Sequence, residues 1–289
     1  MKKTIFILLS LILAIGMFAA TVYKVEESED IQKTLKFQDP SKQKEIIVDN
    51  IFGFIHVEGT SSQDVQLRVH KIIKARTNDK LKLAKEKVTL DISEDGNTID
   101  LYVNGPFRNS DEDKDGGNHE QRNPGYTVHY DFTLLVPSRT SLILKTITEG
   151  DISVKNVEGD FDVNNVNGQI EMTGVSGSGD AHTVNGKVEV SFTTNQNANC
   201  SFKTLNGDVK LNFQPNLSAD FWLETFTGEA FSDFPVSYLP LKPVKESRKE
   251  GKYVYKSNNT TGLRIGKGGP EIKMDTMTGD LLIEKEKFK

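Results

Sequence analysis

Trp222 is the residue whose chemistry points most directly to ligand binding, and it is the only tryptophan in the chain. Its neighbours Phe221 and Leu223 are apolar, so a strand that buries both of them directs the indole outward. An outward aromatic ring stacks on a sugar or anchors a protein partner. Tyr253 and Tyr255 lie in a later polar segment and extend the same predicted binding surface. Alternatively, that polar segment folds over Trp222 and buries it.

An acidic stretch that ends at Gly116 is the candidate for a metal site. Asp111, Asp113 and Asp115 place carboxylates at alternate positions before a glycine, which is how a calcium loop begins. The twelfth position of such a loop needs a bidentate glutamate, and Arg122 stands there instead. The stretch therefore reads better as an acidic surface loop than as a calcium site, and no other cofactor is expected.

Two carboxylates are candidates for catalysis. If strands stack about 4.8 Å apart, Glu171 and Glu189 become neighbours on one outer face, with Lys210 beside them. Adjacent carboxylates can split their pKa values, and solenoid enzymes that cut acidic polysaccharides use such clusters. A solvated charge ladder that Lys210 balances explains the same residues. No serine, cysteine or threonine stands in a recognisable nucleophile elbow, so we expect no enzyme.

The composition excludes some kinds of site and disfavours one class of partner. The single cysteine, Cys200, excludes an intrachain disulfide framework and a thiolate zinc site. The five histidines show no metal-ligand spacing. The formal net charge is -5, and lysines and arginines are interspersed with acidic residues, which disfavours nucleic acid as a partner.

The first residues predict export. Lys2 and Lys3 precede an apolar run over residues 5–20, and a charged stretch begins at Lys24. This is the layout of a signal peptide, and the run also approaches the length of about 20 residues that spans a bilayer. Residues 1–23 are therefore either a cleaved signal or an N-terminal membrane anchor. Both interpretations place the rest of the chain outside the cytoplasm, in the periplasm or at the cell surface.

Short strands follow a polar segment, residues 24–44, which is expected to be a linker without fixed structure. An N-terminal β region is predicted over residues 45–141, because β-branched or alternating runs there are bounded by Gly, Asp and Asn. The runs cover residues 45–57, 65–74, 88–93, 98–103 and 126–136. Residues 78–87 form the one segment with a helical pattern.

From residue 142 to residue 289 glycines recur at fixed spacing. They stand nine residues apart at 150, 159, 168, 177 and 186, and twenty-one apart at 186, 207 and 228. Each is expected to be a corner that needs a positive φ, followed by a short strand whose alternate side chains face a core. The spacing predicts an all-β fold, a β-solenoid-like stack with two strands in each coil of about 18–21 residues. Residues 234–270 break the period and are expected to be an insertion ejected from the last coil, and the charged tail, residues 284–289, is expected to protect the end of the stack.

The run from Tyr130 to Pro137, the following strand from Leu142 to Lys145 and the Val-Asn-Gly corners resemble the DUF4097 family of bacterial β-strand-repeat proteins, which are described as adhesins. The resemblance spans about residues 45–289. It implies an exported or membrane-anchored envelope protein with a solenoid-like body, and it supplies no catalytic residues.

These observations predict a non-catalytic, adhesin-like protein outside the cytoplasm that binds an envelope glycan or protein, or holds a larger assembly in place. One alternative is a polysaccharide-degrading enzyme that uses the outward carboxylates. A second, which only the family resemblance implies, is an accessory protein of an envelope-stress system.

Overall fold

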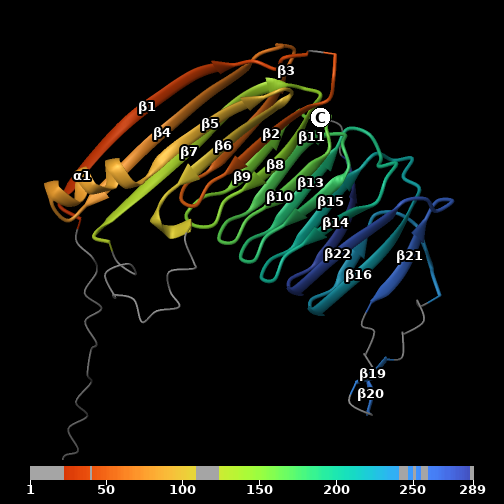
Figure 1. Cartoon of the computed structure of the whole chain (residues 1–289). Coiled ribbons are helices and arrows are strands. Elements are labelled where there is room, and N and C mark those ends of the chain that lie inside the picture. Colours follow the sequence, from red (N-terminus) through yellow and green to blue (C-terminus); the bar gives the residue numbers. More distant parts are fainter. Residues whose placement is uncertain are drawn as a thin grey trace, which may run out of the picture.

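The structure, a computed structural model, describes residues 23–39, 41–108, 124–240, 247–249, 252–254 and 260–286. Within these residues, two large β-sheets face each other across a thin core (Figure 1). We name the ten-stranded sheet A and the eleven-stranded sheet B. A separate pair, β19 (Ser247–Lys249) and β20 (Lys252–Val254), forms a small hairpin.

The spatial order of the strands in each sheet differs from their order in the chain. Sheet A contains, from one edge to the other, β1 (Val25–Leu35), β4 (Val65–Ala75), β7 (Tyr126–Pro137), β3 (Ile55–Thr60), β9 (Ile152–Lys155), β11 (Ile170–Val175), β13 (Val188–Phe192), β15 (Val209–Phe213), β23 (Leu281–Lys285) and β17 (Ala230–Ser232). Sheet B contains β18 (Val236–Tyr238), β21 (Thr261–Ile265), β16 (Ala219–Thr227), β22 (Glu271–Thr278), β14 (Cys200–Lys203), β12 (Gly179–His182), β10 (Phe161–Asn164), β8 (Thr140–Lys145), β2 (Lys44–Asp49), β6 (Thr98–Asn104) and β5 (Thr89–Asp95).

The central part of both sheets is parallel and confirms the predicted solenoid-like coil. The chain runs along one strand of sheet B, turns a corner, and returns along one strand of sheet A, so that β10 is followed by β11 and β12 by β13. Equivalent residues of successive coils are in register. Ile152, Ile170, Val188 and Val209 stack in this way and are each 0% exposed. Alternate side chains therefore fill the interior, as expected.

The structure shows that a positive φ is not the general reason for glycine at the corners. A positive φ is found at Gly186 and Gly207, but not at Gly150 or Gly168. What every corner shares is crowding: a Cβ on Gly168 would lie 2.2 Å from the carbonyl oxygen of Gly150, and one on Gly186 would lie 2.4 Å from that of Gly168. Glycine is required because the backbones of successive coils approach too closely for any side chain.

A polar side chain, buried in most cases, donates to the carbonyl oxygen of several of these glycines. The hydroxyl of Thr183 donates to the carbonyl of Gly168 at 2.8 Å, and that of Thr204 donates to the carbonyl of Gly186 at 2.8 Å. The same arrangement recurs in four other coils, at Thr146, Asn165, Thr276 and Thr225. The working sequence unit is thus Thr or Asn, then an apolar residue, then usually Asn or Thr, then Gly. The threonine half of it was not predicted.

The last coil in the sequence is not the last coil in space. β22 pairs in parallel with both β14 and β16, and β23 pairs in parallel with both β15 and β17. The chain therefore builds the β16–β17 coil one coil-width away and then returns to fill the gap. The expectation that residues 284–289 protect a terminal strand is wrong, because β23 lies inside sheet A.

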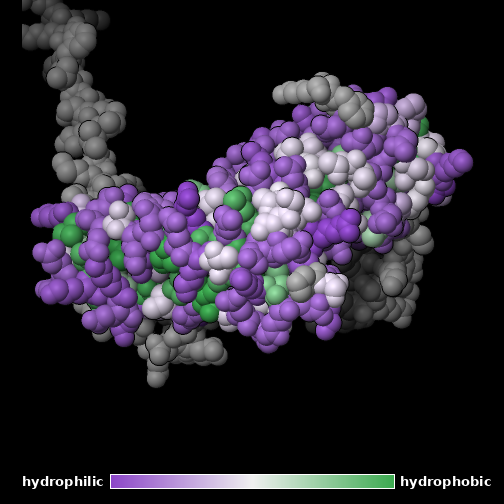
Figure 2. All heavy atoms as spheres, turned by 90° about the horizontal axis from the view of Figure 1, so that it is seen from above, coloured by the Kyte–Doolittle hydropathy of each residue, from purple (hydrophilic) through white to green (hydrophobic). Residues whose placement is uncertain are grey.

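The N-terminal strands extend the stack, and one of them was not predicted. β1 occupies part of the range expected to be an unstructured linker, and it pairs antiparallel with β4 along eleven residues. The helix α1 (Asn78–Lys87) has the predicted bounds and is capped by the side chain of Thr77. A short 3-10 helix, η1 (Pro106–Arg108), follows β6. Figure 2 shows a mostly hydrophilic surface on which hydrophobic residues form a band in the half that holds α1 and the N-terminal strands.

Part of the expected insertion belongs to sheet B. Within the range 234–270, β21 pairs antiparallel with β16, and β18 pairs with β21, so both continue sheet B beyond the last coil. Arg264 of β21 donates twice to the carboxylate of Asp220 on β16, at 2.7 Å each. Phe234 is buried at the same end. These residues cap the end of sheet B.

Among the helices of the described residues, none is long and apolar enough to cross a membrane.

A glycine substitution tests the crowded corner. Gly168→Ala should lower the free energy of unfolding by at least about 2 kcal/mol, because the added methyl group overlaps a carbonyl that belongs to the neighbouring coil. Gly96→Ala is the control, since Gly96 has φ +61 and nothing within 4 Å of the added atom. Its cost should be about 1 kcal/mol, from backbone strain alone. Equal costs in urea unfolding would contradict the crowding.

Candidate functional site

Trp222 lies on the outer face of sheet B, near the capped end of the stack. Its neighbours Phe221 and Leu223 are buried at 0% and 3% exposure, so the alternation predicted from the sequence is correct. Across the sheet Trp222 pairs with Lys273 of β22 on one side and with Gly262 of β21 on the other. The indole is therefore placed by its own strand, β16, and by two strands that come more than thirty residues later, β21 and β22.

The indole is half-covered rather than fully buried or fully exposed. A Cβ built on Gly262 would lie 2.9 Å from the six-membered ring of Trp222, which shows that the ring packs over this glycine. β21 thus supplies a floor for part of the indole. Of the described part of the insertion, Gly262 covers one side of the ring, and the ring also lines a surface hollow.

The hollow beside the indole has a volume of about 380 Å³. It is lined by Ser201, Lys203, Trp222, Glu224, Thr260, Lys273, Met274 and Asp275. The ammonium group of Lys203 lies 2.6 Å from the Asp275 carboxylate, and the hydroxyl of Thr260 donates to Glu224 at 3.4 Å. Two lysines and two carboxylates balance, so the hollow offers hydrogen-bonding groups beside an aromatic surface without a net charge.

Apart from Trp222, sequence analysis did not find the residues of this hollow. Lys203 lies on β14, Glu224 on β16, and Asp275 on β22, and these strands become neighbours only because the last coil returns to fill the gap. Spacing along the sequence carries no signal for that return. A pattern that places Lys and Glu on outward positions of strands predicts only a solvated face.

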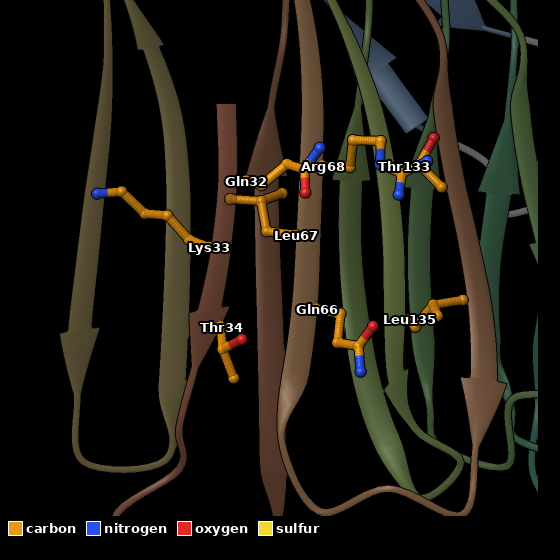
Figure 3. Close-up of a pocket in the computed structure, with 8 residues that line it drawn as sticks. All are labelled: Gln32, Lys33, Thr34, Gln66, Leu67, Arg68, Thr133 and Leu135. Carbon is orange, nitrogen blue, oxygen red and sulfur yellow. The ribbon is translucent and has the colours of Figure 1, made fainter. Parts of the chain in front are cut away.

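A second hollow of about 300 Å³ lies at the other end of the molecule, on the outer face of β1, β4 and β7 (Figure 3). Gln32, Arg68 and Thr133 form one row across the three strands, and Thr34, Gln66 and Leu135 form the next. Lys33 points away from these rows (Figure 3). This hollow has amides, hydroxyls and one guanidinium group, but it lacks an aromatic ring.

The predicted carboxylate ladder is present, and lysine side chains form ion pairs with it. Glu171 and Glu189 are paired in register on β11 and β13, and Lys210 follows on β15. Glu189 accepts a hydrogen bond from Lys187 at 2.8 Å and lies 3.7 Å from Lys210. The Lys187 hydrogen bond, with the charges of both lysines, lowers the pKa of Glu189 despite its partial burial. Glu189 is thus held ionised, unlike a general acid, whose pKa must be raised.

The remaining predicted site residues cannot be placed. Asp111, Asp113, Asp115 and Tyr255 lie outside the described residues. The backbone of Tyr253 is part of β20, but its side chain is not described. Among the residues that the structure does describe, no group of three or more His, Cys, Asp or Glu side chains is arranged to hold a metal ion. Cys200 is buried, and burial raises the pKa of its thiol.

A match to a protein family agrees with this architecture. The family model described as Toastrack DUF4097 matches residues 139–284, which is just over half of the chain. The chain belongs to the DUF4097 family. The match covers the solenoid coils and the end cap, whereas β1 to β7 precede it. No curated protein matches the sequence.

Three solved structures show a distant likeness to this DUF4097 protein. A candidate cell adhesion protein from Clostridium sporogenes ATCC 15579 has 10% identity and a TM-score of 0.44, over 90% of this chain and 100% of that chain. A candidate adhesin from Bacteroides fragilis NCTC 9343 has 13% identity and a TM-score of 0.36, over 89% and 97%. A candidate lipid-binding protein from Parabacteroides distasonis ATCC 8503 has 11% identity and a TM-score of 0.29, over 91% and 97%. At these TM-scores, the function must be argued from the residues of this chain.

The pKa of Glu189 generates a prediction about stability. Because the folded-state pKa is lowered, the ion pairs stabilise the protein above the unfolded-state pKa of about 4.3, and this contribution is lost as the pH falls through the folded-state value. Glu189→Gln should therefore reduce the loss of unfolding free energy between neutral pH and about pH 3. Urea titrations of both proteins across this range measure the effect. The same pH dependence in both would show that Lys187 and Lys210 contribute nothing through Glu189.

Proposed function

We propose that this DUF4097 protein is a non-catalytic binding protein of the bacterial cell envelope, and that the hollow beside Trp222 takes a saccharide unit of an envelope polymer. The observation that carries this proposal is the half-covered indole, held by β21 on one side and bordered on the other by side chains that donate and accept hydrogen bonds. Sugars present an apolar ring face edged by hydroxyls, which is the chemistry that such a surface recognises.

The charge balance of the hollow favours a neutral saccharide over a strongly charged polymer. Lys203 and Lys273 are offset by Glu224 and Asp275 within the same lining. A phosphate-rich or uronic acid polymer would need an excess of cations, and the lining offers none. Ser201 and Thr260 add hydroxyls on either side of the indole, so the orientation of a bound ring would be set by hydrogen bonds.

Binding without catalysis fits the other candidate site. Hydrolysis of a glycosidic bond requires one carboxyl group that is protonated and one that is ionised. Glu189 is held ionised by two lysines, and its pKa moves in the direction opposite to that of a proton donor. The outward ladder is therefore better explained as a set of ion pairs that join successive coils, which continue through Lys210 to Glu284 at 3.2 Å.

The placement in the envelope rests on the sequence. The predicted export signal or anchor, residues 1–23, precedes the first strand almost directly, and family membership implies an exported or membrane-anchored protein. The stack of coils separates the Trp222 hollow from the N-terminal strands. In sheet A, nine steps of about 4.8 Å separate β1 from β17, or roughly 43 Å.

A glycan array tests the proposal directly. The wild-type protein should bind a subset of neutral bacterial glycans, and Trp222→Ala should weaken that binding about tenfold or more, because a lost stacking contact of about 1.4 kcal/mol corresponds to that factor. Lys273→Ala leaves the indole in place and should weaken binding by a smaller factor. Lys273→Ala therefore still tests the site if Trp222→Ala destabilises the fold by removing the ring that packs on Gly262.

Arg68→Ala, in the second hollow, is the matched control and should bind like the wild type. Thermal unfolding of each variant establishes that the stack is intact. If Arg68→Ala loses binding while Trp222→Ala and Lys273→Ala keep it, the binding site is the hollow shown in Figure 3. A wild-type protein that binds no glycan would contradict the proposal.

A further inference from the structure

The outer face of sheet B carries another hollow, of about 370 Å³, besides the one at Trp222. It lies over the beginning of β8, β10, β12 and β14, and its lining includes Ile143, Asp162 and Asn199. Asn199 directly precedes β14, and Ser201 of the same strand lines the Trp222 hollow. β14 therefore borders both hollows, which lie on one face of the molecule.

A row of outward side chains crosses the strands from one hollow to the other. The row contains Trp222, Lys273, Ser201, Asp180 and Asp162, each in register with the next on the neighbouring strand. Figure 1 shows β16, β22, β14 and β10 side by side, and β12 lies between β14 and β10. Four steps of about 4.8 Å separate β16 from β10, or roughly 19 Å.

Three successive strands of this face present the same pair of groups. Each places an oxygen acceptor in the row and a side chain with an N–H group two residues later, on the same outward side. The pairs are Asp162 with Asn164, Asp180 with His182, and Ser201 with Lys203. Asn164 donates to Asp162 at 2.6 Å, and a ring nitrogen of His182 lies 3.3 Å from the Ser201 hydroxyl. An acceptor beside a donor suits neighbouring sugar hydroxyls, because each hydroxyl both donates and accepts.

The character of this face disfavours a protein partner. A protein interface has an apolar centre, and among the described residues none of the exposed large hydrophobic side chains belongs to the row or to its paired donors. An extended peptide binds to an open strand edge, but β22, β14 and β12 each have a partner strand on both sides.

The charges of this face disfavour a charged polymer. The row and the residues two positions later carry four carboxylates and two ammonium groups, so a polyanion would be repelled. They are Asp162, Asp180, Glu224 and Asp275 against Lys203 and Lys273. Lys273 stands between Trp222 and the two aspartates of the row, which disfavours a polycation.

We propose that one linear chain of neutral, 1,4-linked sugars lies across sheet B, with one ring at Trp222 and the following rings over β22, β14, β12 and β10 in turn. The proposal rests on the saccharide site at Trp222 and extends it. An extended 1,4-linked chain advances per sugar by close to the spacing of neighbouring strands. Successive rings therefore meet the equivalent acceptor and donor of successive strands, and the hollow at Asp162 takes the far end of the bound chain.

Oligomers of 1,4-linked N-acetylglucosamine, from one to six units long, test this arrangement by isothermal titration calorimetry of the full chain. Affinity should rise with length up to five or six units. The hexamer should bind at least about tenfold more tightly than the dimer, the factor that about 1.4 kcal/mol of added contact gives.

Two double variants test the register of the bound chain. Asp180→Ala with His182→Ala removes the pair on β12, three strands from Trp222. Dimer binding should be unchanged, whereas the tetramer and longer oligomers should bind about tenfold more weakly. Asp162→Ala with Asn164→Ala, one strand further, should leave the tetramer unchanged and weaken only the pentamer and hexamer.

His56→Ala with Glu58→Ala is the matched control. These residues are an imidazole and a carboxylate at the same spacing, on the outward side of β3 in sheet A. This variant should bind every oligomer like the wild type. Thermal unfolding of each variant establishes that the stack is intact.

The saccharide site and the extended chain fail in different ways. If the wild type binds no oligomer of any length, both are wrong. If the dimer and hexamer bind equally well and Trp222→Ala weakens both, the saccharide site stands and the extended chain is overturned. A loss in the Asp180 and His182 variant that is the same for the dimer and the hexamer also overturns it, because such a loss does not depend on chain length.

Discussion

The close approach of backbones at the glycine corners is the constraint on which the rest of the structure depends. Each corner carbonyl lies where a side chain of the next coil would otherwise be, so the coils stack in one register only. That register aligns the core side chains, the outward charges and the buried threonines at the same time. A slip of one residue would turn every strand inside out, with Ile170 and Val188 in water and the charged residues in the core.

The threonine and asparagine donors complete this constraint. A carbonyl that is buried between coils needs a hydrogen-bond donor, and the side chain that precedes each corner by three residues in most units supplies it from the neighbouring coil. Outside the buried column, the amide of Asn185 donates to Asn167 and that of Asn206 donates to Asn185, both at 2.8 Å. Two rows of polar side chains thus run along the corner, one buried and one exposed, and each row joins successive coils by hydrogen bonds.

Periodicity made the coils predictable, because alternate burial and fixed glycine spacing are local features of the sequence. The place of the last coil was not predictable, since the pattern from Gly207 to Gly228 keeps its period of twenty-one across the gap that Gly279 later fills. β1 was missed for a different reason: an edge strand needs no alternation, and its acidic residues resemble those of a linker. Burial of Phe221 and Leu223 predicted the direction of Trp222, but the hollow beside it depends on the unpredicted coil order.

One free-energy comparison tests the corner column most directly. Thr204→Val keeps the shape of the side chain and removes the donor to the carbonyl of Gly186. It should lower the free energy of unfolding by about 1–3 kcal/mol, the cost of a buried polar group that loses its partner. Thr204→Ser restores the hydroxyl and should recover part of the loss, whereas Thr173→Val, at an exposed position, should cost almost nothing. If Thr204→Val is as stable as the wild type, the buried donors do not hold the coils together, and the account of this stack is wrong.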